Sequence, residues 1–273
     1  MIDMRLTGGL GNQLFQFGAA VVLSRHFDLP IRLWAGAMQH YATRRDLVLP
    51  HLLDLNRLRA TVCERPSWIQ RTRLARLAPG VHGRTAWVSD RNVLAVAHQT
   101  SRLRSAQLDG YFIESIDQAF FDEALDLLRP ATAAPDPAAR PENRVCAMHI
   151  RGGDFLKLGW ALEDALSYYQ TSLARVRERE PGVRIVAVTD DRDYAGKLLR
   201  RLGEDAEVAP GGLLSNFDLL RTADFAILSN STFSFWAGAW RHGSCLDWST
   251  LAPDSWRPGT RRMIRLRSEA QPQ

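Results

Sequence analysis

The second half of the chain alternates apolar segments with amphipathic ones, and this pattern constrains the fold more than any other feature. The segments 144–150, 183–189 and 225–229 are short and apolar, which favours buried strands. Shorter strands are expected near 206–209 and 244–247. Between them, apolar residues at helical spacing predict helices at about 163–179, 192–202, 215–223 and 231–241. This alternation predicts an α/β fold with a parallel sheet covered by helices on both faces.

The start of the chain has the same character. Residues 3–7 are predicted to form a strand, 8–13 a glycine-rich loop, and the following residues a helix that ends near Phe27. A second strand is expected at 31–34, so the chain opens as a βαβ unit. Farther on, alternating Leu and Arg predict helices at 46–59 and 67–78 without a clear order of elements.

A proline-rich stretch divides the chain. Residues 129–143 contain four prolines and several small residues, a composition that favours a linker over a helix or a strand. We therefore expect an N-terminal domain at 1–135 and a C-terminal domain at 136–273.

Composition narrows the classes of partner and location. The net charge of +5 is compatible with an anionic ligand, but no zinc-finger spacing or RNA-binding strand motif supports nucleic acid. The sequence contains no run of about 18 apolar residues that could cross a bilayer. This predicts a cytoplasmic protein with at most peripheral membrane contact. Cys63, Cys146 and Cys245 are widely spaced, so neither a disulfide framework nor a zinc site is expected.

Ligands of parallel sheets bind at the carboxyl ends of the strands, and three groups of polar residues follow predicted strands. His149, Arg151 and Asp154 follow the first of them. His149 could equally be packed in the core, and Asp154 could form a turn after the two glycines. Arg151 is harder to explain structurally, because the neighbouring glycines allow a ligand to approach the backbone.

The second group begins a predicted helix. Asn230, Ser231 and Thr232 follow an apolar strand, so their free N–H groups and hydroxyls could bind an anion. Ordinary N-capping explains the same residues, and Phe233 fits a core position. In the third group, Asp191 and Asp193 match the D-x-D pattern by which some glycosyltransferases hold a metal, but three residues are a weak signal, and Asp190 or Asp191 as a helix N-cap is the favoured interpretation. No metal site is expected.

The loop at 8–13 offers backbone N–H groups and the side-chain amides of Asn12 and Gln13 at a strand end. Gly9 and Gly11 resemble a dinucleotide-binding fingerprint, but Leu14 stands where its third glycine would be. An NAD-dependent oxidoreductase is therefore disfavoured. A polar ligand contact by Gly9, Asn12 and Gln13 is expected instead.

Taken together, these stretches resemble the bacterial α-1,2-fucosyltransferases of glycosyltransferase family eleven. The resemblance depends on four stretches in order: GGLGNQLFQFG at the start, LDGYFIES at 108–115, HIRGGDF at 149–155 and LSNSTFSFWAGAW at 228–240. It implies a glycosyltransferase B-type fold, in which two Rossmann-like domains face each other across a cleft. The implied reaction is metal-independent, inverting transfer of L-fucose from GDP-fucose to a galactose-type hydroxyl.

The resemblance also implies partners and residue roles. The acceptor would be an oligosaccharide or lipid-linked glycan of polysaccharide biosynthesis, bound by the N-terminal domain, and the C-terminal domain would hold the nucleotide sugar. In related enzymes the motif is His-x-Arg-Arg-x-Asp, and its first arginine, here Arg151, contacts the donor diphosphate. The other roles follow by position: His149 and Asp224 for the nucleoside, Ser231, Thr232 and Phe233 for the β-phosphate, and Asp190 for orienting Arg151.

One position departs from the family pattern. Gly152 occupies the place of the second arginine, which leaves open a different nucleotide sugar or a non-catalytic nucleotide-sugar binding protein. The general base is also open, with Asp154, Glu163 and His26 as candidates.

Overall fold

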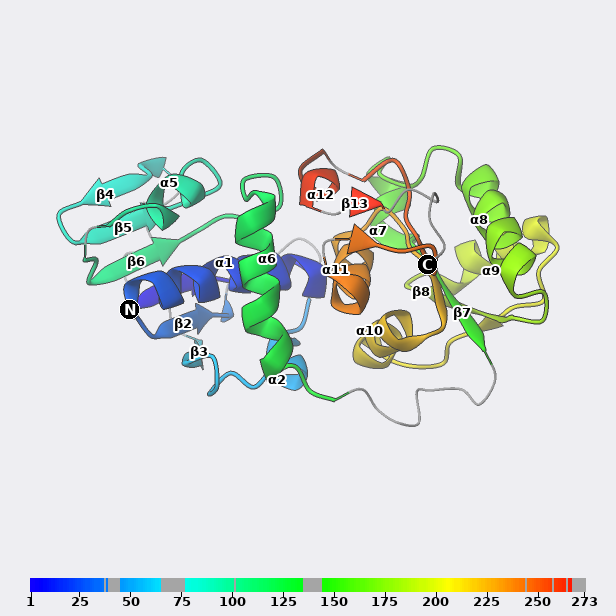
Figure 1. The fold of residues 1–273 in the computed structure, drawn as a ribbon, viewed down its shortest axis with the longest axis horizontal. Coiled ribbons are helices and arrows are strands. Elements are labelled where there is room, and N and C mark those ends of the chain that lie inside the picture. Colours follow the sequence, from blue (N-terminus) through cyan, green and yellow to red (C-terminus); the bar gives the residue numbers. More distant parts are fainter. Residues whose placement is uncertain are drawn as a thin grey trace. The chain divides into compact units, whose positions relative to one another are not determined.

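The computed structural model describes residues 1–36, 38, 45–64, 77–100, 102–134, 144–243, 245–256, 258–263 and 265–266. The chain forms two compact units (Figure 1). The first consists of Met1–Ala133 together with helix α12 (Pro258–Met263), and the second is built on Ala134–Arg257. The predicted span of 136–273 for the second domain differs from this division, because α12 returns to the first unit.

The first unit is built on a six-stranded sheet with the order β3-β2-β1-β6-β5-β4. Its strand pairs are parallel except for β4 and β5, which are antiparallel. The strands are β1 (Ile2–Arg5), β2 (Ile31–Trp34), β3 (Ala60–Cys63), β4 (Gly80–His82), β5 (Thr85–Val88) and β6 (Ser105–Leu108).

Helix α1 (Leu10–Phe27) is the central helix of this unit and is buried along most of its length. It packs against β1 and α6 (Gln118–Leu128), with the rings of Phe15 and Phe121 6.3 Å apart. Asp28 ends α1 in the left-handed conformation with φ 51°. The remaining helical segments are α2 (Leu49–Leu52), α5 (Val93–Ala97) and the 3₁₀ turn η2 (Arg129–Ala131).

The predicted opening βαβ unit is confirmed, but the helix predicted at 46–59 is wrong. Only Leu49–Leu52 is helical, and Leu53 is extended before the chain turns into β3. The backbone N–H of Asp54 donates to Ala131 O (2.7 Å), so pairing with a distant segment overrides the local helical pattern. Most of the helix predicted at 67–78 lies outside the described residues.

The second unit contains a five-stranded sheet with the order β12-β10-β7-β8-β9, in which every pair is parallel. Its strands are β7 (Val145–Ile150), β8 (Arg184–Thr189), β9 (Glu207–Val208), β10 (Phe225–Ile227) and β12 (Thr250–Leu251). β11 (Cys245–Leu246) pairs separately with β13 (Arg265–Leu266). β7 is buried along its whole length, as its central position requires.

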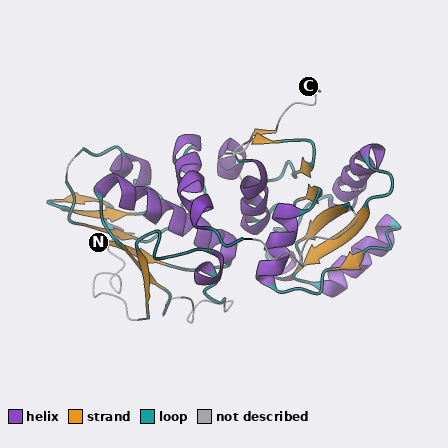
Figure 2. Ribbon diagram, turned by 60° about the horizontal axis from the view of Figure 1, so that its bottom comes forward, coloured by secondary structure: helices purple, strands orange, loops and turns teal. Residues whose placement is uncertain are grey.

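Helices lie on either side of this sheet (Figure 2). α8 (Ala165–Arg179) packs against α9 (Arg192–Leu202), and α10 (Leu213–Thr222) packs against α11 (Thr232–His242). The short helix α7 (Gly153–Lys157) follows β7 directly. The predicted alternation of strands and helices is therefore confirmed, with most element ends within two residues of the prediction. Among the described residues, no helix combines the length and apolar character needed to cross a membrane.

The strand order of the second sheet locates its ligand-binding edge. From β7 the chain moves to β8 and β9 on one side, whereas β10 and β12 lie on the other side. The order therefore reverses between β7 and β10, and the loops after these two strands diverge at the carboxyl edge. In open α/β sheets such a reversal is where a ligand binds.

Candidate functional site

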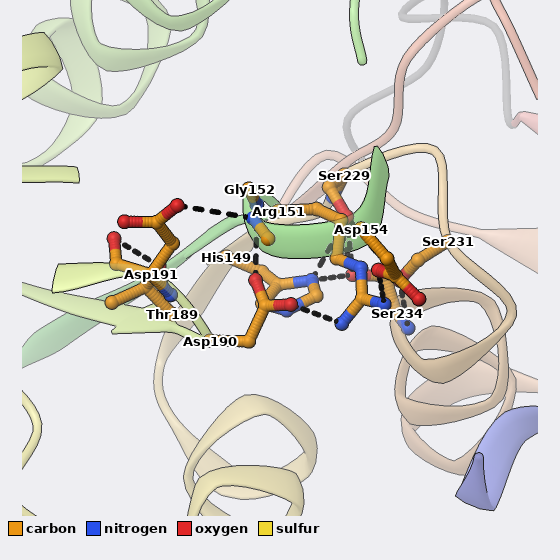
Figure 3. A network of polar contacts seen from close by, with 11 residues as sticks. His149, Arg151, Gly152, Asp154, Thr189, Asp190, Asp191, Ser229, Ser231 and Ser234 are labelled. Carbon is orange, nitrogen blue, oxygen red and sulfur yellow. Dashed lines mark hydrogen bonds and ion pairs between the residues drawn. The ribbon is translucent and has the colours of Figure 1, made fainter. Parts of the chain in front are cut away.

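Arg151 is the first residue after β7, at the point where the strand order reverses (Figure 3). Its guanidinium forms ion pairs with Asp154 and with Asp190, where Nη1 lies 2.6 Å from Oδ2. The guanidinium also lies over the ring of Phe155, 4.7 Å from its centroid. Two carboxylates and an aromatic ring therefore fix the cation in place.

One donor of this guanidinium is left over. The Nε atom of Arg151 is buried and has no hydrogen-bond partner among the described residues. An unpaired buried N–H is costly, on the order of 1–3 kcal/mol. A bound anion could accept this hydrogen bond, so the orphaned donor is consistent with a ligand oxygen in contact with Arg151.

Asp190 links Arg151 to the backbone of the same loop. Its second oxygen, Oδ1, accepts a hydrogen bond from the backbone N–H of Gly152 at 2.9 Å. The neighbouring Asp191 accepts from the N–H of Gly153 at 3.2 Å and caps α9 through the N–H of Tyr194 at 3.0 Å. These backbone hydrogen bonds, that of Tyr194 first, lower the pKa of Asp191. The N-cap interpretation of Asp191 is therefore confirmed.

Packing explains why glycine stands at position 152. A Cβ atom there would lie 2.7 Å from Cβ of Asp191, closer than real Cβ contacts, and 3.1 Å from Cδ1 of Tyr194, which is a tight contact. Gly153 has a φ of 49°, which disfavours a side chain at that position as well. A second arginine at 152 could not be accommodated unless the start of α9 moved.

His149 lies on β7 and is buried, with 3% of its surface exposed. Its Nδ1 atom is hydrogen-bonded to the hydroxyls of Ser234 and Ser229, the latter at 2.9 Å, and its ring packs 5.3 Å from that of Phe233. Burial, together with the nearby charge of Arg151, lowers the pKa of His149 to about 3. The imidazole is therefore neutral near pH 7, and its Nδ1 contacts tie β7 to the start of α11.

The start of α11 is held by a cluster of serines (Figure 3). Ser231 caps the helix by accepting from the N–H of Ser234 at 3.2 Å. The Ser229 hydroxyl contacts the hydroxyls of Ser231 and Ser234 at 3.3 and 3.2 Å. A helix start held in this way presents the positive end of its dipole at the carboxyl edge, which suits an anion.

Asn230 connects α11 to the loop after α7. Its Nδ2 donates to the carbonyl of Trp160 at 2.7 Å. Its Oδ1 is buried and has no hydrogen-bond partner within the described part of the chain. Asn230 therefore braces this edge of the site and leaves one acceptor for a ligand donor.

The structure gathers most of the predicted C-terminal residues at one sheet edge, at or just after the carboxyl ends of β7, β8 and β10. They are His149, Arg151, Asp154, Asp190, Asn230, Ser231, Thr232 and Phe233. Sequence reasoning missed Ser229 and Ser234 as partners of His149. The spacing of Ser234 three residues after the N-cap Ser231 is a signal that could have indicated it.

Asp224 is a correction to the sequence-based prediction. It precedes β10, and its Oδ2 accepts from the backbone N–H of Val145, the first residue of β7, at 2.9 Å. Asp224 therefore lies at the amino edge of the sheet, one strand length from Arg151, or about 20 Å at roughly 3.3 Å per residue. It secures the start of β7, so the predicted nucleoside contact is wrong.

Gly9 and Gln13, two of the predicted ligand contacts of the N-terminal domain, lie at the start of α1. Gly9 caps α1, with open space where a side chain would stand. Gln13 is fully buried, and its amide donates to Gly8 O and Asp46 O at 3.1 and 2.9 Å and accepts from Val48 N at 3.3 Å. The Gln13 amide thus braces its own unit, which corrects the prediction of a ligand contact by this side chain.

Asn12 lies in the first turn of α1, beside Gly8. Its Nδ2 would be 2.6 Å from a Cβ at Gly8, whose φ is 81°. Gly8 therefore has to be glycine for Asn12 to take this position. The contacts of Gly9 and Asn12 with a polar ligand stay predictions.

The candidate general bases differ in position. His26 lies in the last turn of α1, where its ring contacts the carboxylate of Glu123 at 3.1 Å, at the opposite end of α1 from the glycine-rich loop. Glu163 is exposed in the turn before α8. Asp154 is the only one of the three that contacts Arg151. Among the described residues, no group of three or more His, Cys, Asp or Glu side chains could hold a metal ion.

Comparisons with solved structures give the same fold. The chain is similar to NodZ alpha-1,6-fucosyltransferase soaked with GDP-fucose, with 13% identity, coverage of 86% of this chain and 90% of that chain, and a TM-score of 0.50. It is also similar to POFUT1 in complex with GDP-fucose, with 10% identity, coverage of 94% and 98%, and a TM-score of 0.55. A third similar structure is the fucosyltransferase NodZ from Bradyrhizobium, with 12% identity, coverage of 88% and 92%, and a TM-score of 0.50.

The fold therefore defines an α/β protein of the glycosyltransferase B type, as predicted. No curated protein matches the sequence. The family model for glycosyl transferase family 11 matches residues 115–256, which include β7, α11 and the whole site around Arg151. The chain belongs to glycosyl transferase family 11.

Proposed function

We propose that the protein transfers L-fucose from GDP-fucose to a galactose-type hydroxyl of a glycan, with inversion and formation of an α-1,2 linkage. The observation that carries the proposal is the position of Arg151, whose cation and orphaned Nε donor lie where the strand order reverses. Both Arg151 and the start of α11 border His149, so the two anion-attracting groups are close to each other. The resemblance to known fucosyltransferases supports fucose as the transferred sugar.

The proposed reaction places positive groups where negative charge grows. As the acceptor hydroxyl attacks the anomeric carbon, the bond to the diphosphate breaks and the leaving group gains negative charge. Arg151 and the N-terminus of α11 would stabilise this charge more strongly than the bound ground state, which accelerates the reaction. Because the guanidinium is fixed by Asp190 and Phe155, little reorganisation is required.

Asp154 is the candidate for removing the proton from the acceptor hydroxyl. Its carboxylate contacts Arg151, and it lies one helical turn after the strand end. In an inverting displacement the base acts on the face of the sugar opposite the departing diphosphate, within hydrogen-bond reach of the attacking hydroxyl. Of the three candidates, Asp154 alone touches the Arg151 cluster, which places it at the site. We assign it this role as part of the proposal.

Gly152 leaves open a nucleotide sugar other than GDP-fucose as the donor substrate. The family motif has two arginines, and the corresponding stretch of this chain has one, Arg151. The packing of Gly152 against Asp191 shows that the loop is built for glycine, so the loss of the second cation is compatible with an ordered site. A different nucleotide sugar, or binding without transfer, would follow if the single arginine does not support fucose transfer.

Thermal-shift measurements with GDP, UDP and NAD test the ligand class, followed by hydrolysis and transfer assays with GDP-fucose. The proposal predicts stabilisation by GDP above that by UDP and none by NAD, and transfer of fucose to lactose. Stabilisation by GDP with neither hydrolysis nor transfer would instead favour a nucleotide-sugar binding protein. Stabilisation by UDP alone would point to another donor.

A further inference from the structure

Helix α7 and the loop after it expose apolar side chains beside the site. Leu156, Leu158 and Trp160 are 41%, 54% and 50% exposed. Lys157 is the only charged residue from 155 to 160. Exposed apolar side chains that cluster beside a ligand site often mark contact with a ligand or a partner.

Trp160 is held in place from two sides. Its backbone N–H donates to Phe155 O at 2.9 Å, and its ring meets that of Phe155 edge-on, with centroids 5.8 Å apart and planes at 79°. Its carbonyl accepts from Asn230 Nδ2 at 2.7 Å. Phe155 in turn lies under the guanidinium of Arg151. Trp160 is thus tied both to the arginine and to the residue before the α11 N-cap.

This arrangement keeps Trp160 half exposed beside Phe155 and Asn230. Pyranose rings have faces of C–H groups, which pack well on the electron-rich face of an indole. A nucleobase has polar edges that need hydrogen-bond partners, and only two residues of 156–160, Lys157 and Trp160, have side chains with a hydrogen-bonding group. The chemistry of this loop therefore suits a sugar better than a base.

We propose that Trp160 is an aromatic platform on which the acceptor sugar stacks, with Leu156 and Leu158 extending the apolar surface beside it. Trp160 belongs to the second unit, so this proposal departs from the expectation that the N-terminal domain binds the acceptor. This inference rests on the proposed function, because it assigns a binding residue for the acceptor of that reaction. Trp160 would act on acceptor binding, since Arg151 and the start of α11 serve the donor diphosphate. The contacts of Trp160 with Asn230 and Phe155 would hold the platform at a fixed position relative to that diphosphate.

The test compares Trp160→Ala and Trp160→Phe with a matched control, Trp248→Ala. Trp248 belongs to the same unit and is equally exposed, at 48%, but it packs 5.5 Å from Phe225 at the start of β10, on the amino edge of the sheet. The measurements are KM and kcat for lactose, KM for GDP-fucose, and GDP affinity by calorimetry. Binding to vesicles of phosphatidylcholine and phosphatidylglycerol is measured by sedimentation.

Trp160→Ala should raise the KM for lactose roughly three- to tenfold, the range expected when an aromatic contact is lost. Trp160→Phe should retain most of the affinity for lactose, and Trp248→Ala should leave it unchanged. The GDP affinity and the KM for GDP-fucose should stay at wild-type values in all three variants.

Other outcomes overturn the platform. An unchanged KM for lactose in Trp160→Ala would refute it, and so would a weaker GDP affinity or a raised KM for GDP-fucose, which would assign Trp160 to the donor. Loss of vesicle binding with unchanged kinetics would make the loop a membrane contact instead. If the wild-type protein neither binds GDP nor transfers fucose, the proposed function fails and the platform fails with it. If the wild-type and Trp160→Ala proteins both transfer fucose normally, the platform proposal is refuted and the proposed function stands.

Discussion

Gly152 offers a sharp test, because the family motif and the packing of this chain predict opposite results. If the motif alone decided activity, Gly152→Arg would restore the second arginine, add a cation beside the diphosphate and raise the rate of transfer. In the structure, however, even a Cβ atom at 152 would lie 2.7 Å from Cβ of Asp191. The side chain of Asp191 cannot move freely, because it caps α9 and accepts from Gly153 N.

The magnitude follows from this overlap. Inserting atoms into a well-packed site costs typically 1–3 kcal/mol, and for a chain of this size about 2 kcal/mol corresponds to a fall in Tm of roughly 4–8 °C. Gly152→Ala should cause much of this loss, since the first added atom makes the contact. GDP affinity should fall at least tenfold in Gly152→Arg, because displacement of Asp190 and Asp191 would release Arg151.

Differential scanning fluorimetry and calorimetry with GDP measure these two effects. Gly182→Ala is the matched control, because a Cβ at Gly182 in the turn before β8 has no atom within 4 Å. Its Tm and GDP affinity should remain close to those of the wild type. If Gly152→Arg keeps the wild-type Tm and transfers fucose faster, the packing explanation for Gly152 is refuted.

Three further predictions concern the same site. Asp190→Asn should lower kcat/KM for transfer by at least tenfold, because it removes the charge that fixes Arg151. The Tm should change little, since the asparagine can still accept from Gly152 N. Unchanged kinetics would contradict this prediction. Since the folded state holds the pKa of His149 near 3, below its ordinary 6.5, the unfolded chain binds a proton there that the folded chain excludes. The free energy of unfolding should therefore fall as the pH drops from about 6.5 towards 3, and less steeply in His149→Asn, as denaturant titrations would show; equal slopes would argue against a buried neutral imidazole. Transfer should persist in EDTA, and a loss of activity that Mg²⁺ or Mn²⁺ reverses would disprove metal independence.

The second unit was predictable because its local signals agree. β7 and β8 are continuous apolar segments that the sheet buries, and Asp191 and Ser231 cap helices at the positions their residue types favour. Since carboxyl ends of parallel strands share one edge, the gathering of Arg151, Asp190 and Ser231 followed from the order of elements.

The first unit was harder to predict, because its strands are short and their pairing is not local. β3 and β6 have four residues each and include polar ones, and both are defined by strands far away in the sequence. At 46–59 the helical pattern of apolar residues is used to pack irregular turns instead. Local propensity cannot report such tertiary contacts.

The misplaced site residues have equally physical causes. Asp224 precedes its strand, so it lies at the amino edge, whereas residues that follow a strand reach the ligand edge. Gln13 points into its own unit, because three backbone groups there need its amide. Side-chain direction of this kind is decided by packing that the sequence pattern does not specify.

The central claim is that the Arg151 guanidinium stabilises the departing diphosphate, and Arg151→Ala tests it most directly. The matched control is Arg144→Ala. Arg144 is exposed, lies directly before β7 and forms an ion pair with Glu180. Transfer from GDP-fucose should fall on the order of 10²–10³-fold in Arg151→Ala, while the far-ultraviolet circular dichroism spectrum is retained and Arg144→Ala remains close to wild type. A well-folded Arg151→Ala protein that transfers fucose at near the wild-type rate would contradict the account.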